Sequence, residues 1–205
     1  VIRVNGEEQT GMVSGSYFTL NRDWTEGDTI EIEFPMTIDV DTEYHNTLSV
    51  QRGPLLYSLK IEQEGREYTP ETNSMRGINI TPQGGLKNRE VYPLSDWNYG
   101  LIVDEDNPES SFTVVENNAE LAQQPFDVDT APIVLKAQGQ LIPEWTLDGN
   151  IPSTLGYGAI PYDESLVEEI ELIPFGCGRL RISQFPKIGE CDMENITFDE
   201  VHTFA

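Results

Sequence analysis

Apolar and polar residues alternate along much of this chain with a period of two. The strongest apolar stretch is residues 48–61, LSVQRGPLLYSLKI, in which the alternation runs up to a Gly53-Pro54 pair and resumes after it. A period of two is typical of a strand with one buried face. Because glycine permits a bulge and proline removes a ladder donor, we predict one long central strand over 48–61, bent at Gly53-Pro54.

Shorter segments show the same alternation. Residues 29–34 place two isoleucines and Phe34 on one face and glutamates on the other, which predicts a half-buried strand with a solvated outer face. The Asn5-Gly6 pair follows a short apolar start and is a strong hairpin signal. Further strands are expected over residues 97–103, 131–137 and 168–174.

The chain lacks an amphipathic helical pattern of useful length, so we predict an all-β fold. The expected architecture is an antiparallel β-sandwich, jelly-roll-like, with long loops and almost no helix. Residues 1–62 would supply its first strands and residues 90–186 the remaining ones. The polar stretch 63–89, rich in glycine and proline, is expected to be a long connection or an insertion. Residues 187–205 are expected to form a tail, with an edge strand as the alternative.

Charge narrows the classes of partner. The 205 residues include 36 Asp and Glu against 12 Lys and Arg, a net charge of −24. Such a surface repels phosphate backbones and anionic lipids, so we expect neither nucleic-acid nor membrane partners. The chain also starts abruptly in strand-like residues, which suggests a piece of a longer protein. The sequence assigns no cellular compartment to the protein; a secreted or periplasmic bacterial protein is one option.

Acidic residues are also the first candidates for catalysis, because glycoside hydrolysis needs two carboxylates flanking the bond. Glu31, Glu33, Glu169 and Glu171 lie on strand faces whose opposite faces are apolar. We interpret them as a solvated outer face, since burial within an apolar run would be needed to raise the pKa of an acid catalyst. The sequence therefore offers no catalytic residue.

Metal binding is the next possibility. Asp104 and Asp106 lie in an acidic turn, DEDNPE, whose oxygens have the chemistry that calcium prefers. The turn lacks the twelve-residue calcium loop with its central glycine and terminal glutamate. We expect no cofactor in this chain, with a structural calcium at Asp104 and Asp106 as the alternative.

Aromatic residues and cysteines complete the candidates. Trp97, Tyr99, Trp145 and Tyr157 lie on or beside predicted loops, where exposed rings stack on sugar faces, although ordinary core or loop packing is the favoured interpretation for any single ring. Cys177 lies between two glycines and is interpreted as a small residue in a tight turn rather than as a reactive thiol. Its pairing with the second cysteine, Cys191, is left open.

Several blocks occur in an order that resembles one family. They are RDW with GD and FPM within residues 17–36, QRGPLLY at 51–57, VYP and WNYGL at 91–101, APIVLKA leading to IPEW at 131–145, and LIPFG with LRI at 172–182. Together they resemble the C-terminal β region of the β-L-arabinofuranosidase-like glycoside hydrolases, family 127 and relatives. The resemblance covers most of residues 1–186.

The resemblance implies a non-catalytic role. In that family the chemistry resides in a preceding α/α-barrel, which uses a cysteine nucleophile near zinc and a glutamate acid–base, and this chain has neither motif. The implied partners are that absent N-terminal catalytic domain and a second copy in a homodimer; a carbohydrate-binding module using the loop aromatics is the alternative. Arg52, Gly53 and Pro54 become a structural family marker. Arg52 is expected to form a salt bridge beside the bend or to face the missing domain.

Overall fold

The computed structural model describes residues 1–68, 74–75, 78–79, 88–117, 122–155 and 158–189. Its contacts divide the chain into two compact units, Val1–Thr37 and Ile38–Ala205, each described separately below. Among the described residues, helix is confined to short 3-10 segments, and none could cross a membrane. These segments are η1 (Tyr44–Asn46), η3 (Pro108–Ser111), η4 (Val128–Thr130) and η5 (Glu164–Leu166).

The first unit is a three-stranded antiparallel sheet with the order β2-β1-β3. The strands are β1 (Ile2–Val4), β2 (Glu7–Glu8) and β3 (Ile30–Ile32). Asn5 and Gly6, with φ of 52° and 82°, connect the first two strands, and two positive φ values are the signature of a type I′ turn. The predicted hairpin at Asn5-Gly6 is therefore confirmed.

One face of this unit is apolar and open. Ile30, Ile32 and Phe34 are 50%, 57% and 75% exposed, so the prediction that this segment buries its apolar face is wrong. Val4, which lies opposite Ile30 on the same face, is 2% exposed, so the part of this face on β1 is covered and the part on β3 is not.

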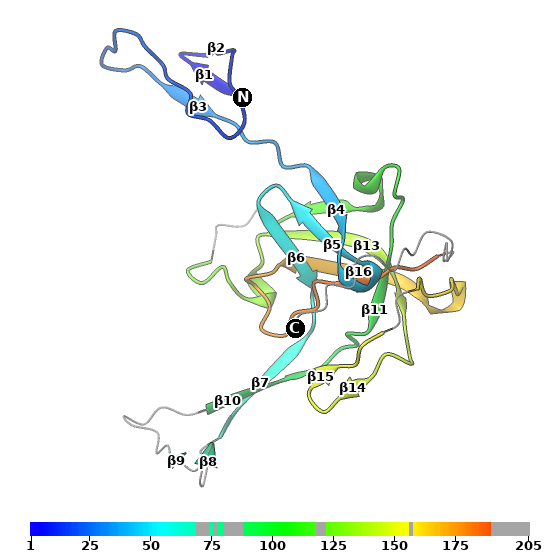
Figure 1. Ribbon diagram of the computed structural model, residues 1–205. Coiled ribbons are helices and arrows are strands. Elements are labelled where there is room, and N and C mark those ends of the chain that lie inside the picture. The colour runs from blue at the N-terminus through cyan, green and yellow to red at the C-terminus, as the bar shows by residue number, and fades with distance from the viewer. Residues whose placement is uncertain (69–73, 76–77, 80–87, 118–121, 156–157, 190–205) are drawn as a thin grey trace. The chain divides into compact units, whose positions relative to one another are not determined.

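The second unit is built on an eight-stranded antiparallel sheet (Figure 1). The strand order is β11-β13-β16-β6-β5-β17, with β12 also paired to β13 and β4 also paired to β5. The strands are β4 (Ile38–Thr42), β5 (Thr47–Arg52), β6 (Leu55–Leu59), β11 (Tyr99–Ile102), β12 (Thr113–Glu116), β13 (Ile133–Leu141), β16 (Val167–Pro174) and β17 (Phe185–Pro186).

The predicted long strand over residues 48–61 is instead a hairpin. Strands β5 and β6 pair antiparallel, with Arg52 opposite Leu55, so Gly53 and Pro54 are the two residues of a tight turn. Gly53 has a φ of 56°, while the proline ring holds the next φ near −65°; a positive φ at the first central position defines a type II′ turn. The Gly-Pro pair thus reverses the chain instead of bending it.

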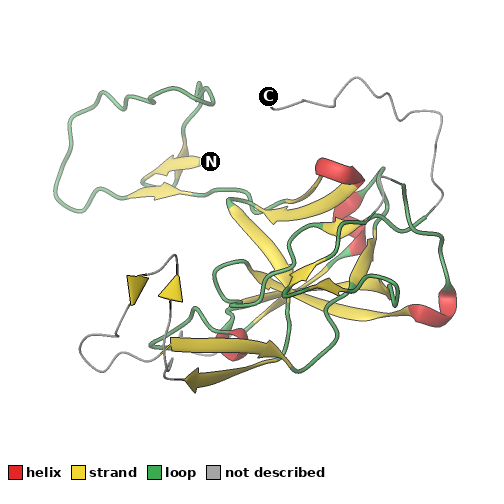
Figure 2. Ribbon diagram, turned by 60° about the horizontal axis from the view of Figure 1, so that its bottom comes forward, coloured by secondary structure: helices red, strands yellow, loops and turns green. Residues whose placement is uncertain are grey.

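Strand β6 joins two packed layers. Its first residues, Leu55 and Leu56, pair with β5, whereas residues 57–59 pair with β16. Side chains from β4 and β5 share one core with side chains from β13 and β16, which confirms an all-β, antiparallel sandwich with almost no helix (Figure 2). The buried core residues are Ile38, Leu48, Val50, Tyr57, Leu59, Ile61, Tyr99, Leu101, Phe112, Leu135, Ala137, Ile170, Leu172 and Phe185.

The sheet curls until its end strands meet. Leu101 in β11 forms a parallel bridge with Lys187, directly after β17, and the Ile188 amide donates to the Leu101 carbonyl at 3.3 Å. Gly100 permits this approach, because a Cβ there would lie 2.9 Å from the Pro186 carbonyl oxygen. The residues 187–189 of the predicted tail therefore take part in the fold; the rest of that tail lies outside the described residues.

Two-stranded ribbons extend the second unit. They are β7 (Gln63–Tyr68) with β10 (Asn88–Pro93), β8 (Ser74–Met75) with β9 (Ile78–Asn79), and β14 (Leu147–Asp148) with β15 (Ile151–Pro152). The stretch 63–89, predicted as a connection, thus begins and ends in paired strands. The ribbon of β7 and β10 matters below because it forms part of a pocket.

The turn at Gly53 generates a stability prediction. We expect Gly53→Ala to lower the free energy of unfolding by about 1–2 kcal/mol, because a Cβ disfavours positive φ. Gly176→Ala is the matched control: its Cβ would meet only Phe126 Cδ1, at 3.8 Å, and should change stability by less than about 0.5 kcal/mol. Urea denaturation of both variants tests this, and equal effects would contradict the assigned turn.

Candidate functional site

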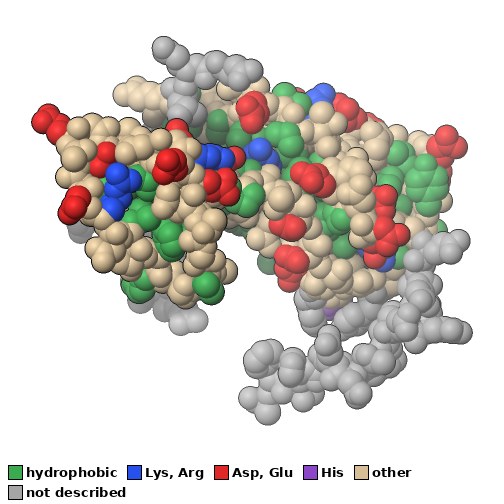
Figure 3. All heavy atoms as spheres, turned by 90° about the horizontal axis from the view of Figure 1, so that it is seen from above, with side chains coloured by type: hydrophobic (Ala, Val, Ile, Leu, Met, Phe, Trp, Pro, Cys, Tyr) green, Lys and Arg blue, Asp and Glu red, His purple; other side chains and the backbone are tan. Residues whose placement is uncertain are grey.

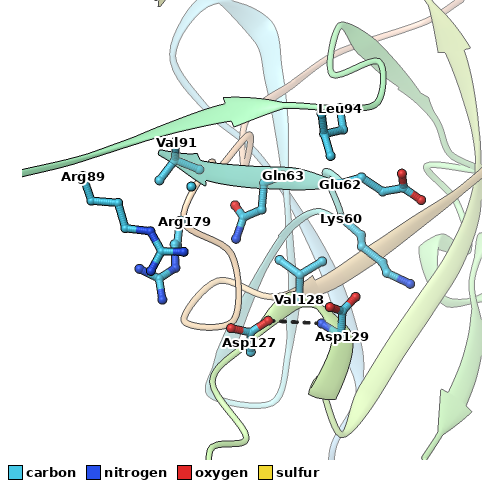
Figure 4. A pocket seen from close by; sticks show the side chains of 11 residues that line it. Lys60, Glu62, Gln63, Arg89, Val91, Leu94, Asp127, Val128, Asp129 and Arg179 are labelled. Atoms are coloured by element: carbon cyan, nitrogen blue, oxygen red, sulfur yellow. Dashed lines mark hydrogen bonds between the residues drawn. The ribbon is translucent and has the colours of Figure 1, made fainter. Parts of the chain in front are cut away.

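A cavity of about 360 Å³ lies beside the ribbon of β7 and β10 in the second unit (Figure 4). Its walls come from residues 60–65, from β10, from η4 with the residue before it, and from the loop after β16. The lining side chains belong to Lys60, Glu62, Gln63, Arg89, Val91, Leu94, Asp127, Val128, Asp129 and Arg179, with Gly65 completing the wall. Segments far apart in the sequence thus meet at one polar cavity.

Charges of both signs line this pocket, but they are not all paired. Lys60 Nζ lies 2.7 Å from Glu171 Oε2, so Lys60 forms an ion pair with a residue on the outer face of β16. Arg89 and Arg179 form no ion pair within the part of the chain that the structure describes. Two guanidinium groups therefore line the cavity without a carboxylate partner among the described residues.

Backbone geometry fixes part of the pocket. A Cβ at Gly65 would collide with the Arg89 guanidinium, so the glycine lets this side chain lie flat against β7. Gln63 Oε1 accepts from the Leu180 amide at 3.2 Å, which leaves the amide N–H groups of that glutamine as donors. On another wall, Asp127 caps η4 by accepting from the Asp129 amide.

Two of the three carboxylates on β16 pair with lysines, and the third accepts from a tyrosine. Glu169 Oε1 lies 2.6 Å from Lys136 Nζ, and Glu171 pairs with Lys60 as described above. Glu168 accepts a hydrogen bond from the Tyr99 hydroxyl. Burial, reinforced by this carboxylate, raises the pKa of Tyr99 far above its ordinary value. Elsewhere, acidic side chains are scattered over the visible surface and outnumber the basic ones (Figure 3).

The aromatic candidates for carbohydrate binding are mostly core residues. Trp145 is 7% exposed, meets Trp97 edge-on at a centroid distance of 5.2 Å, and donates from Nε1 to the Ser153 carbonyl at 2.8 Å. Tyr99 is also 7% exposed. Stacking on a sugar needs an open ring face, so their placement gives the predicted role no support. Tyr157 lies outside the described residues.

The acidic turn uses its own oxygens. Asp104 Oδ1 accepts from the amides of Asp106 at 3.1 Å and Asn107 at 3.3 Å, and the Asp104 amide donates to Ser111 Oγ. These bonds form an Asx-type turn, which stabilises the loop without an ion. Within the described ranges, no three His, Cys, Asp or Glu residues gather closely enough to hold a metal. A calcium at Asp104 and Asp106 stays a prediction.

Arg52 does not form the expected salt bridge among the described residues, and its facing the absent catalytic domain stays a prediction. It forms no ion pair with any carboxylate that the structure describes, and its Nε is buried without a hydrogen-bond partner. Burial raises the pKa of the neighbouring Tyr57, and the charge of Arg52 acts in the opposite direction. Arg52 thus exerts its electrostatic effect on the buried Tyr57 of β6.

Cys177 is a structural residue. Its side chain is 3% exposed, packs with Val128 and Ile173, and donates weakly from Sγ to the Pro125 carbonyl at 3.5 Å. Burial, and next the charge of Asp127, raise the pKa of the thiol, which disfavours the nucleophilic thiolate. The interpretation as a small, unreactive residue agrees with this placement. The second cysteine lies outside the described residues.

Comparison with known proteins concerns the first unit. Residues 1–36 match the family model of the β-L-arabinofuranosidase, GH127 middle domain. Together with the all-β fold, this match points to a β region related to a glycoside hydrolase. This match confirms the relation to GH127 over that stretch, and the part matched is the middle domain rather than the C-terminal region that the motifs indicated. No curated protein and no solved structure matches the chain.

Burial of Cys177 generates a second prediction. In a Cys191→Ala background, the native protein should react with Ellman's reagent at least about a hundredfold more slowly than in urea, because labelling requires opening. A raised pKa also means that the rate should keep rising above pH 8.5, near the ordinary pKa of a thiol. Rapid native labelling that levels off below that pH would contradict this placement.

Proposed function

We propose that this chain is a non-catalytic β-sandwich region of a glycoside hydrolase related to GH127, supporting the catalytic domain of the same polypeptide or its dimerisation. The observation that carries the proposal is the match of residues 1–36 to a middle domain. A middle domain, by its description, is one part of a larger polypeptide. This chain then contributes architecture, while the hydrolytic chemistry belongs to another part of that polypeptide.

The open apolar face of the first unit supports this proposal. Ile30 and Ile32 point to the same side of β3, since strand side chains alternate, and Phe34 continues the row. Contiguous exposed apolar surface is typical of an interface with another protein part. Because this face belongs to the matched residues 1–36, we assign its partner to the rest of the parent enzyme.

The placement of the reactive candidates supports a non-catalytic role. Cys177 is buried as a thiol, and Glu169 and Glu171 are held by lysines on the outer face of β16. An acid catalyst is typically placed in a cleft beside its substrate, whereas these two carboxylates lie on a strand face and bind lysine side chains of the same chain.

We expect the purified chain to show no turnover of p-nitrophenyl β-L-arabinofuranoside above the buffer rate, and Cys177→Ala to behave identically. Release of p-nitrophenol, followed at alkaline quench, measures this. The parent polypeptide is the positive control. Turnover that copurifies with the chain through repeated chromatography would contradict the proposal.

The apolar face provides an independent test. Ile32→Asp should change the free energy of unfolding of the present chain by less than about 0.5 kcal/mol, because the side chain is already exposed. In the parent polypeptide the same change should cost about 1–3 kcal/mol, since it would bury a charge at an interface. Glu31→Gln on the opposite face is the matched control. Equal effects of Ile32→Asp in both contexts would remove the assigned interface.

A further inference from the structure

We propose that the pocket between the β7–β10 ribbon and η4 binds a carboxylate-bearing sugar, a uronic acid, through Arg89 and Arg179. This inference goes beyond the proposed architectural role and does not rest on it. The evidence is the charge of the pocket, the geometry of its donors and the composition of its remaining walls.

The charge distribution is the first argument. Acidic residues outnumber basic ones 36 to 12 in this chain, yet three of those 12, Lys60, Arg89 and Arg179, line one cavity. With carboxylates in such excess, an arginine would be expected to find one. Arg89 and Arg179 are without an ion-pair partner among the described residues, although both extend into the same cavity. An external anion is the partner that this arrangement lacks.

The donors of the pocket suit an oxyanion. Guanidinium groups bind carboxylates and phosphates through two parallel N–H donors, which makes arginine a preferred residue for such groups. The two arginines come from β10 and from the loop after β16, and Figure 4 draws both side chains at the same end of the pocket. Gly65 leaves room for the Arg89 guanidinium, and Gln63 adds amide N–H donors to the same pocket.

The other walls select a sugar over a simple anion. Glu62, Asp127 and Asp129 offer acceptors suited to hydroxyl groups, while Val91 and Val128 provide apolar contact for a ring face. These carboxylates would repel a phosphate dianion more strongly than a singly charged ligand. A volume of about 360 Å³ falls at the small end of ligand pockets, which suits one or two sugar rings.

The experiment is isothermal titration of the full 205-residue chain with D-galacturonate at low ionic strength. The neutral sugar D-galactose, sodium acetate and inorganic phosphate are titrated in parallel. We expect galacturonate to bind with a dissociation constant in the millimolar range or tighter, and each of the other three to bind at least about tenfold more weakly.

Variants locate the binding. Arg179→Gln and Arg89→Gln should each weaken galacturonate binding at least about tenfold. Arg66→Gln is the matched control: this arginine also belongs to the β7–β10 ribbon, but it pairs with Glu64 outside the cavity and should leave affinity unchanged. Gly65→Ala keeps every charge and displaces only the Arg89 guanidinium. Weaker binding in that variant would therefore show that affinity depends on where this guanidinium lies and not only on its charge.

Several outcomes would overturn the proposal. They are undetectable galacturonate binding, equal affinity for galactose, acetate or phosphate, and equal losses in Arg66→Gln and Arg179→Gln. Thermal unfolding of each variant accompanies the titration, and Gly65→Ala keeps the proposal testable if an arginine variant fails to fold. Loss of binding in Gly65→Ala and in both pocket variants, with unchanged binding in Arg66→Gln, is the supporting result.

Discussion

The division of β6 between two partners organises the second unit. Its first two residues pair with β5 and its last three with β16, so one short strand holds both layers of the sandwich. The type II′ turn at Gly53-Pro54 sets this register, because a two-residue loop leaves no freedom in how β5 and β6 align. Fully buried side chains from both partners, Val50 and Leu172, then meet in one core.

The sequence predicted much of this fold because alternation depends only on which face of a strand is buried. The strands around Leu135 and Leu172 follow directly from that pattern. The error at Gly53-Pro54 has an instructive cause. Apolar residues have even numbers in β5 and odd numbers in β6, a change that a bulge within one strand would explain. In a hairpin with a two-residue turn, however, each even-numbered residue also lies opposite an odd-numbered one, as residues 52 and 55 do. A change of parity across Gly-Pro therefore indicates a two-residue hairpin as well.

The candidate pocket was beyond the reach of sequence patterns. Arg89 and Arg179 are separated by about ninety positions, and neither belongs to a local motif; only the ribbon and the loop after β16 bring them to one cavity. The sequence shows that basic residues are scarce, but it does not show that three of them line the same cavity. Conversely, Trp97 and Trp145 resembled loop aromatics because residue type does not reveal whether a connecting segment folds back onto the core.

Closure of the curled sheet by Lys187 carries a consequence for biosynthesis. Residues 185–188 cover the edge of β5 and touch β11, although they come after every other strand of the sheet. A nascent chain that has reached β16 therefore exposes two strand edges that can pair with other chains. Both edges are paired only once residues 185–188 have left the ribosome, so truncation before residue 185 would favour aggregation even though most of the core residues are already present.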